Sequence, residues 1–347
     1  MIMKVPRLNI YSGRIVLKKL FVLFLALILL GGCAPGRQNN VLTRTEFLMD
    51  TFVTITLYGS RDEDALNSAF DLCRHFNYMF SRHSPLSELY RLNNADGQPV
   101  TVSPELARLL EIAVYYSSLS GGLLDITIAP VMDLWFDDHH DDAPRTPPST
   151  EDIPQALALV DYRNIIISGD TVTLKNGAMI DLGGIAKGYI ADEIGRYLLE
   201  RGVTSAIINL GGDVLVIGGR PDGNPFRIGI RKPFETPREI MGVVTARDSA
   251  IFTSGVYERY FIHEDVRYHH ILNAHTGAPA NAGIASVTVV SELGVDGDAL
   301  SILCFLLGAE RGLELIEDID GAEAIFVKDD GSVVMSSGMH EVFEFME

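Results

Sequence analysis

The chain has 347 residues, of which 47% are hydrophobic and 21% are charged, and its formal net charge is −18 because 46 acidic residues outnumber 28 basic ones. This surplus of carboxylates excludes a nucleic-acid binder that works through clustered Lys and Arg. The apolar fraction is too high for a disordered chain. The 32 glycines and 15 prolines imply many tight turns rather than a helical bundle.

The N-terminal segment has the pattern of an export signal. Residues 1–32 contain five basic residues and no acidic one, and they include an unbroken apolar run from Leu20 to Leu30. That run is too short to span a bilayer comfortably and has the charge order of a signal peptide. It ends in an LGGC sequence at Cys33, which is similar to a bacterial lipobox, where the thiol is lipidated after cleavage. An ordinary secretory signal is the alternative. Without residues 1–32 the net charge would be −23.

After the signal, periodicity predicts one α+β domain over residues 47–347, with mixed sheets and flanking helices. Residues 33–46 are polar without periodicity and are expected to form a tether. A strand is predicted at 51–58, helices at 63–80 and 104–118, a long loop at 81–100 and a hairpin at 164–175. In the second half, strands are expected at 205–209, 213–217, 226–231, 286–290 and 322–327, and helices at 185–201 and 298–307.

Two features of the chain allow more than one interpretation. The stretch 136–150 combines acids, two histidines and three prolines, so it is either a solvated surface loop or a metal site, and the loop is favoured. Cys73 and Cys304 each lie among apolar residues on an expected helix. They could form one disulfide, but isolated buried thiols are the favoured interpretation.

The most informative stretch is DLGGIAKG at 181–188, directly before an expected helix. Its paired glycines let backbone N–H groups approach a ligand, and a helix N-terminus offers N–H donors with partial positive charge. Lys187 adds a full charge, and Asp181 adds an acceptor. The segment therefore suits a phosphate, although a turn that only permits tight packing is the alternative. A second glycine pair, in NLGGD at 209–213, is explained by a hairpin turn.

Three histidines and two aspartates mark the C-terminal half. His269 and His270 are adjacent on an expected strand and point to opposite faces, which argues against a closed zinc site with His275. His270 is either a hydrogen-bonding or proton-transfer group or a satisfied core histidine. Asp298 follows Asp296 at the start of an apolar helix, so it is either the N-cap or a carboxylate ligand for Mg²⁺ beside a phosphate.

These segments, in this order, strongly resemble the ApbE family of flavin transferases, over about residues 46–310. The DLGGIAKG segment and the HHIL…TG segment at 269–277 are the most specific matches. The other matches are MDT at 49–51, FS at 80–81, SEL at 87–89, LN at 92–93, GLLDIT at 122–127, Pro130, LW at 134–135, NLGGD at 209–213, TSG at 253–255, YER at 257–259 and DALS at 298–301.

The resemblance implies an Mg²⁺-dependent FAD:protein FMN transferase. Such an enzyme splits FAD, releases AMP and links FMN through a phosphoester to a Thr or Ser of an exported flavoprotein subunit. The acceptor is expected in a membrane electron-transport complex or exported reductase, and the enzyme is expected as a lipoprotein outside the cytoplasm, on the periplasmic side of the inner membrane. The alternatives are an FAD pyrophosphatase that gives FMN and AMP, and an FAD-binding lipoprotein without catalysis.

The resemblance also assigns residues. His270 and Asp298 are expected to be catalytic, and Asp298 with the carbonyl oxygen of Ala186 is expected to hold the metal. The residues expected to bind FAD are Met49, Ser87, Glu88, Leu123, Leu124, Asp125, Asp181, Lys187, Ile271 and Thr276.

The chain departs from the family pattern at three places. The family usually has Thr four residues after the metal aspartate, but Ile302 stands here and cannot ligate, so Ser301, Asp296 or water fills the gap, or the metal affinity is lower. His83 replaces an aromatic Tyr in the first loop, which weakens ring stacking there. Asn273-Ala274 replaces a usual Asp-Pro, which affects only the local turn.

Overall fold

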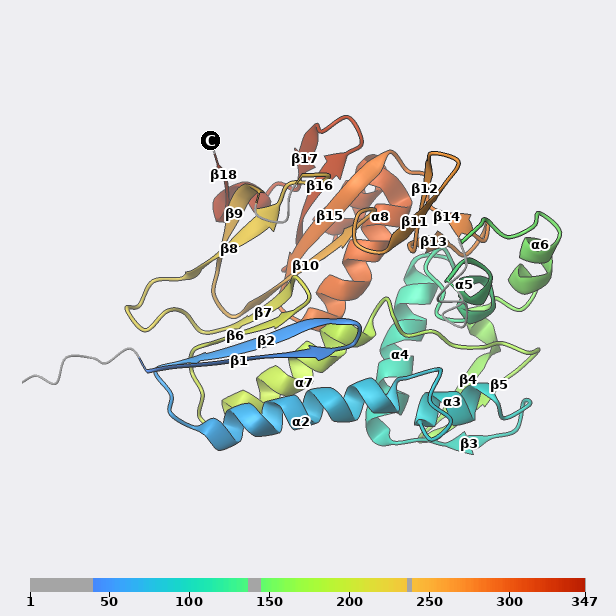
Figure 1. Ribbon diagram of the computed structural model, residues 1–347, viewed down its shortest axis with the longest axis horizontal. Helices are drawn as coiled ribbons and strands as arrows, with labels where there is room; N and C mark the ends of the chain where they lie inside the picture. Colours follow the sequence, from blue (N-terminus) through green and yellow to red (C-terminus); the bar gives the residue numbers. More distant parts are fainter. Residues whose placement is uncertain (1–39, 137–144, 236–238, 347) are drawn as a thin grey trace, which may run out of the picture. The chain divides into compact units, whose positions relative to one another are not determined.

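The computed structural model describes residues 40–136, 145–235 and 239–346 (Figure 1). The expected signal peptide, Cys33 and the first half of the expected tether lie outside these residues, as do residues 137–144 of the loop expected at 136–150. In the part of the chain that the structure describes, no helix combines the length and the apolar character needed to cross a bilayer.

The centre of the domain is an eight-stranded sheet in which neighbouring strands are antiparallel. Alternating β-branched and apolar residues, as in TFVTITLY, form its strands. Its strands, in spatial order, are β1 (Val41–Leu48), β2 (Thr51–Tyr58), β6 (Ala206–Leu210), β7 (Asp213–Ile217), β10 (Ser249–Gly255), β15 (Ile284–Ser291), β16 (Glu323–Lys328) and β17 (Val333–Met335).

The two faces of this sheet pack against different elements, because successive side chains of a strand point to opposite faces. Leu215, Phe252 and Val287 belong to the larger core, together with the helices α2 (Glu63–Met79), α7 (Ala186–Glu200) and α8 (Gly294–Glu317). Val214, Ile251 and Ile325 belong to a second core. That core is shared with a three-stranded sheet of β8 (Phe226–Arg231), β9 (Ile240–Ala246) and β18 (Phe343–Phe345) and with α9 (Met339–Val342).

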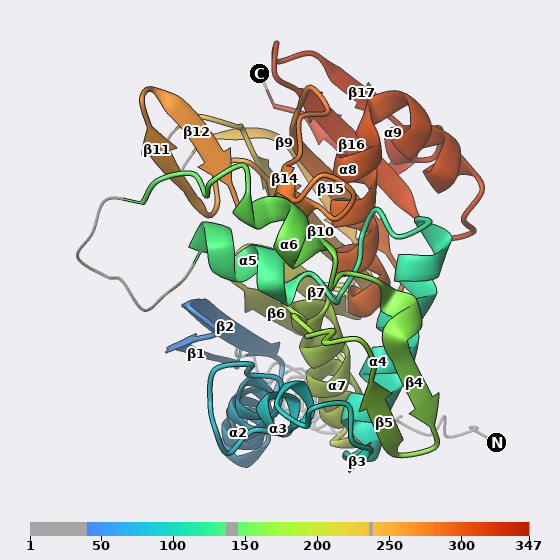
Figure 2. The same cartoon turned by 90° about the vertical axis from the view of Figure 1, so that its right-hand side faces the viewer.

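Smaller elements complete the domain beside these layers (Figure 2). They are α3 (Glu88–Asn93), β3 (Val100–Thr101), α4 (Pro104–Leu119), α5 (Ala129–Phe136), α6 (Asp152–Leu157), the 3-10 helix η1 (Tyr162–Asn164), β4 (Ile165–Ser168) and β5 (Thr171–Leu174). After the main sheet's β10 come the hairpin of β11 (Tyr260–His263) and β12 (Val266–His269) and the pair β13 (Leu272–Asn273) and β14 (Ala278–Pro279).

Most predicted elements are confirmed. The strands at 51–58, 213–217 and 226–231 have the predicted bounds, and the hairpin around Gly169 is present. The helix expected to end at residue 307 has its break there, because Gly308 (φ 80°) leaves the helical region before the helix resumes. Cys73 and Cys304 are both buried and unpaired, as isolated thiols.

Three predictions about the architecture are wrong. The expected tether extends to residue 46, but β1 begins at Val41. Its half-buried face carries the charged Arg44 and Glu46 while Val41 and Phe47 are exposed, so the usual alternation of apolar and polar residues is missing. The expected loop at 81–100 contains α3, which Ser87 caps by accepting from the Tyr90 N–H at 3.0 Å. The sheets are antiparallel rather than mixed. Among the described residues, parallel pairing is confined to the isolated bridge between Ile128 and Met179.

Candidate active site

The glycine-rich segment at 181–188 forms the turn that leads into α7. Asp181 is held in this turn because its backbone N–H donates to the Ile126 carbonyl at 2.8 Å and its carboxylate accepts from the Gly183 N–H at 2.7 Å. Helix α7 begins at Ala186, and no side chain caps it. Most of its first turn is nevertheless bonded within the fold: the Ala186 N–H donates to the Leu182 carbonyl at 2.9 Å, the Gly188 N–H to Asp298 at 2.9 Å and the Tyr189 N–H to the Ile185 carbonyl at 3.3 Å.

Helices α7 and α8 touch through backbone at two glycines. An ideal Cβ on Gly188 would lie 2.2 Å from the carbonyl oxygen of Gly294, so only glycine allows the helices to approach this closely. Asp192 of α7 then accepts from the N–H groups of Gly294 at 2.6 Å and Val295 at 2.9 Å, which caps α8 from a neighbouring helix. This contact fixes α8, and with it Asp298, against the start of α7.

Asp298 does not cap α8, contrary to the first of its two predicted roles. The helix begins at Gly294, four residues earlier, because Asp192 supplies the cap from a distant part of the sequence. Asp298 is instead buried inside the first turns of α8. Burial and the charge of Asp213 raise its pKa to about 7, against the lowering effect of the Lys187 charge.

Lys187 lies among carboxylates. Its ammonium forms an ion pair with Asp213, the first residue of β7, whose other oxygen accepts from the Thr253 N–H at 3.0 Å. Burial acts to lower the pKa of Lys187, but the charges of Asp213, Asp298 and Glu258 outweigh it and raise the pKa above its ordinary value. We call Lys187, Asp213 and Asp298 the charged cluster. It holds one positive charge against two carboxylates.

The charged cluster lies at the end of the sheet where two hairpin turns meet. The turn between β6 and β7 contains Gly211, where an added Cβ would lie 2.3 Å from the Thr51 hydroxyl at the start of β2. Met49 precedes that residue in the tight turn between β1 and β2, with φ 54°, and is half-buried. The Met49 turn is therefore next to the turn that leads into Asp213.

His270 directly follows β12. Its Nδ1 lies 3.1 Å from the Arg259 carbonyl oxygen, which can only accept, so we assign the ring proton to Nδ1 and a lone pair to Nε2. Burial and the charge of Lys187 lower the pKa of His270 to about 4, against the raising effect of the hydrogen bond to the Arg259 carbonyl. The ring is therefore neutral near pH 7 and close enough to Lys187 to sense its charge. His269 is a core residue, with Nε2 3.0 Å from the Ala280 carbonyl.

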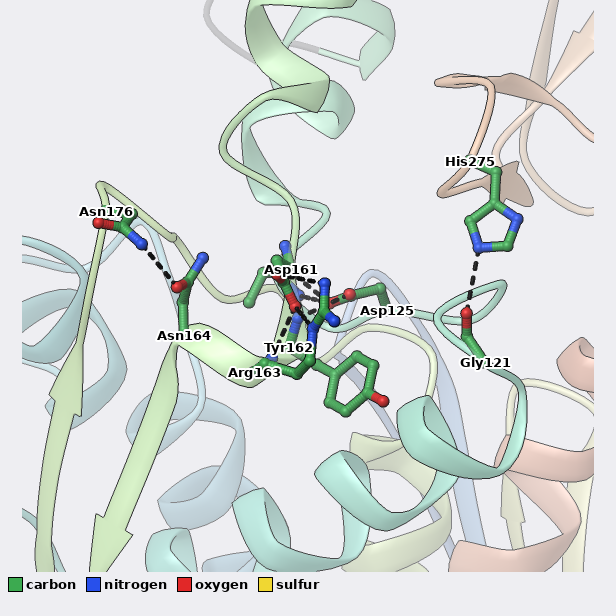
Figure 3. A network of polar contacts seen from close by, with 9 residues as sticks. Gly121, Asp125, Asp161, Tyr162, Arg163, Asn164, Asn176 and His275 are labelled. Atoms are coloured by element: carbon green, nitrogen blue, oxygen red, sulfur yellow. Dashed lines mark hydrogen bonds and ion pairs between the residues drawn. The ribbon is translucent and has the colours of Figure 1, made fainter.

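The segment at 121–126 lies beside the segment at 271–276. The Leu123 carbonyl accepts from the Ala274 N–H at 3.3 Å, and Ile271 is buried directly before β13. Figure 3 shows the His275 ring directed at the Gly121 carbonyl, with Nε2 and oxygen 3.2 Å apart. The predicted FAD residues Leu123, Leu124 and Ile271 are thus brought together, while Thr276 is exposed in the adjoining turn.

Three other residues predicted to bind FAD are engaged within the fold. The Asp125 carboxylate accepts from the Thr127 N–H at 2.8 Å, the Thr127 hydroxyl at 2.6 Å and the Tyr162 N–H at 2.8 Å (Figure 3). Ser87 caps α3, and Glu88 accepts from the Ser103 N–H at 2.7 Å, before α4. A ligand could use the backbone of these residues, but their polar side-chain atoms serve local structure.

The model of the ApbE family matches residues 49–326, a range that includes the glycine-rich turn, the charged cluster and His270. The chain belongs to the ApbE family. An FAD:protein FMN transferase of Klebsiella pneumoniae is 33% identical over 304 residues, which are 86% of this chain and 93% of the relative. Another, of Treponema pallidum, is 31% identical over 333 residues, with 89% and 90% of the two chains covered.

Solved structures of ApbE proteins have the same fold. The crystal structure of the ApbE protein of Thermotoga maritima superposes with a TM-score of 0.81 at 30% identity, over 87% of this chain and 99% of that one. The flavin transferase ApbE of Vibrio cholerae gives a TM-score of 0.79 at 27% identity, over 88% and 99%. The ApbE relationship therefore extends over nearly the whole described domain.

Two residues of this ApbE site escaped the sequence analysis. Arg82 is mostly buried and bridges Asp181 at 2.8 Å and Asp133 at 2.5 Å, so it holds the glycine-rich turn against α5. Asp192 caps α8. Both make their contacts across long stretches of sequence. The position of Arg82 directly after the FS match is the one hint that the sequence offers.

The charged cluster fits a hard cation only in part. Within the described ranges, no three His, Cys, Asp or Glu side chains are grouped as a metal site. Ile302 packs toward Gly184 and supplies no oxygen. Ser301 bonds with Ser254 at 2.8 Å, and Asp296 accepts from Tyr116 at 2.7 Å, so both candidate substitutes are engaged. Asp298 and a backbone carbonyl still suit Mg²⁺, which keeps waters and substrate phosphate oxygens as ligands.

Proposed function

We propose that this chain is an FAD:protein FMN transferase. The ApbE membership and the named function of its relatives support this activity. The observation that carries it for this chain is the charged cluster, in which Lys187 lies with two buried carboxylates at the start of α7. Such a site can hold a pyrophosphate only together with a cation, because the two carboxylates would otherwise repel it.

In this proposal the reaction joins a protein hydroxyl to the FMN half of FAD. The hydroxyl oxygen attacks the phosphorus of that half, and the new O–P bond forms as the bond to the bridging oxygen breaks. AMP leaves with the bridging oxygen, and the hydroxyl proton passes to Nε2 of His270, which is neutral and bears a lone pair. The main task of the protein in such a transfer is to position groups and to balance charge.

Lys187 and Asp298 would each help to balance the negative charge of the pyrophosphate in a different way. Lys187 remains cationic because the neighbouring carboxylates raise its pKa, so it can pair with a phosphate oxygen. Asp298 and the Ala186 carbonyl oxygen would hold Mg²⁺, which would neutralise phosphate charge when bound. Asp181 and its partner Arg82 would fix the turn that faces the pyrophosphate.

The proposal also includes a location and an acceptor class. The lipobox-like sequence at Cys33 supports a lipid anchor, with the folded domain outside the cytoplasm, on the periplasmic side of the inner membrane. A Thr or Ser of an exported flavoprotein subunit in an electron-transport complex or reductase would receive FMN there.

The test is a transfer assay with the full chain, FAD, Mg²⁺ and a flavin-free flavoprotein subunit that carries a flavinylation sequence. We expect a fluorescent acceptor band in a denaturing gel and one AMP per labelled acceptor. Release of FMN and AMP without a labelled band would indicate a pyrophosphatase instead. FAD that stays intact through long incubation with bound protein would indicate a flavin-binding protein without catalysis.

A further inference from the structure

The hairpin of β11 and β12 presents one anchored face and one open face. On the anchored face, Phe261 and Tyr268 stack with ring centroids 5.2 Å apart, and Trp135 stacks on Tyr268 at 5.5 Å. Figure 2 shows this hairpin beside α5, which carries Trp135. The open face carries Tyr260, Ile262 and Arg267, because β11 and β12 pair Ile262 with Arg267. All three are exposed, Ile262 at 60%.

The open face continues as a row of two arginines and three aromatic rings. The Arg267 guanidinium carbon lies 4.5 Å from the ring centre of Tyr260 and 5.0 Å from that of Phe234. Phe234 is 54% exposed and contacts Tyr257 with ring centroids 6.3 Å apart, and Arg231 lies 5.3 Å over Tyr257. We call Arg231, Tyr257, Phe234, Arg267, Tyr260 and Ile262 the arginine–aromatic ladder.

The ladder starts at the candidate active site. Tyr257 precedes Glu258, whose charge acts on Lys187. The base of the hairpin is closed by His270, whose backbone N–H donates to the Arg259 carbonyl at 3.0 Å. Ile262 is three residues from Arg259 along β11, a distance of about 10 Å in a strand. A bound peptide of a few residues could thus contact the ladder and still bring a hydroxyl to His270.

The chemistry of the ladder suits a protein segment. Arg and Tyr are enriched among the residues that contribute most to protein interfaces, and stacked guanidinium groups keep their N–H donors available. Exposed arginines in a row are unexpected on a chain of net charge −18. A segment with apolar side chains and a carboxylate would complement the rings and the guanidinium groups of the ladder. Glu264 and Asp265 at the hairpin turn would repel such a carboxylate, which places it nearer the base.

We propose that the arginine–aromatic ladder is the docking surface for the acceptor protein, and that it binds an apolar, carboxylate-bearing segment near the flavinylated hydroxyl. This inference rests on the proposed function, since that function requires a protein substrate at the site where the ladder begins. Attraction between Arg267 and the carboxylate would weaken as salt is added.

The test compares full-length variants in the transfer assay and in direct binding to the flavin-free subunit without FAD. Arg267→Glu and Ile262→Asp should each raise the acceptor KM and the binding Kd about tenfold, which corresponds to about 1.4 kcal/mol. The FAD Kd and the kcat at saturating acceptor should change less than about twofold. Arg267→Lys should be intermediate, because it keeps the charge but loses the planar stacking. Leu199→Asp, at a 55% exposed position of α7, is the matched control and should behave as wild type.

Each other outcome overturns this inference. Unchanged acceptor KM and Kd in both variants would show that the acceptor docks elsewhere, and weaker FAD binding would assign the ladder to the FAD site. A change of oligomeric state in size-exclusion chromatography would assign it to contacts between copies of this chain. The proposed function fails separately, if the wild type binds the subunit but transfers no FMN.

Discussion

Two groups of aspartates lie in this domain, and they differ in the hydrogen bonds that their carboxylates accept. Asp125 accepts three hydrogen bonds from Thr127 and Tyr162, and the neighbouring Asp161 accepts from Arg163 (Figure 3). Among the described residues, Asp298 accepts one hydrogen bond, from Gly188, although it is equally buried. Both aspartates belong to motifs of the family, so motif membership alone does not separate their roles.

The difference indicates which carboxylate is available for chemistry. A buried carboxylate that accepts hydrogen bonds from N–H and hydroxyl groups of the fold contributes to folding, because its removal leaves those N–H groups unpaired. A buried carboxylate that faces another carboxylate and one lysine is costly until a cation arrives. We therefore expect substitutions of Asp125 to change stability and substitutions in the charged cluster to change activity.

The largest effect is expected for Asp298→Asn. It removes the charge that would hold Mg²⁺, so transfer should fall by at least about a hundredfold. Unfolding in metal-free buffer should show equal or higher stability, because burial raises the pKa of Asp298 and the ionised form is unfavourable there. A variant that kept wild-type transfer rates would show that Asp298 is only structural.

A second large effect is expected for His270→Gln. Loss of the proton acceptor should lower kcat by about a hundredfold, with a smaller change in the FAD Kd. The pH dependence of stability should change as well. Because the folded pKa is about 4 and the ordinary value is 6.5, the wild type loses stability as the pH falls from about 6.5 to 4, and the variant lacks this loss. Identical acid-unfolding profiles would contradict the assigned burial of the neutral ring.

Asp125→Ala should act in the opposite way. It leaves the N–H groups of Thr127 and Tyr162 unpaired, so the free energy of unfolding should fall by about 2–4 kcal/mol in urea titrations. The kcat per folded molecule should stay within about twofold of wild type. Loss of kcat in a variant of unchanged stability would move Asp125 from the structural group to the catalytic one.

Lys187→Gln should weaken FAD binding about tenfold, since a charge-assisted contact with phosphate is lost. Fluorescence quenching of FAD measures the affinity, and circular dichroism checks that the fold is retained. Lys175→Gln, at an exposed lysine in the turn after β5, is the control and should leave the FAD Kd unchanged. An unaltered FAD Kd in Lys187→Gln would refute the phosphate role of Lys187.

The smallest effect is expected for Ile302→Thr, which restores the hydroxyl usual in the family. The Ile302 side chain points toward Gly184 in the glycine-rich turn, so a hydroxyl there could reach a cation held by Asp298. The Mg²⁺ concentration for half-maximal transfer should fall about threefold, equivalent to about 0.7 kcal/mol. A higher requirement for Mg²⁺ would show that Ile302 serves packing alone.

The sequence predicted the elements whose patterns are local. TFVTITLY alternates, Gly169-Asp170 marks its hairpin and Gly308 breaks α8 where apolar periodicity stops. It did not predict β1, whose half-buried face carries Arg44 and Glu46, or α3, which is only six residues long. The sequence also did not predict the order of the eight strands, because pairings such as β2 with β6 depend on packing between distant segments.

The site was predictable where a motif concentrates its chemistry. Lys187 and Asp298 were found because glycines and paired acids mark them, and the structure places both in one cluster. Asp192 and Arg82 could not be found, since an aspartate that caps another helix and an arginine that bridges two acids have no local signature. The hydrogen bonds of Asp125 were equally hidden, because Tyr162 is 37 residues away.

The central claim is that Asp298 in the charged cluster binds the cation that FMN transfer requires. Calorimetric titration of Mg²⁺ into the full chain tests it without relying on activity, with wild type, Asp298→Asn and Ile302→Thr compared at pH 8. We expect one saturable site in the wild type, tighter binding in Ile302→Thr and no binding in Asp298→Asn. Binding of Mg²⁺ to Asp298→Asn with wild-type affinity would contradict it.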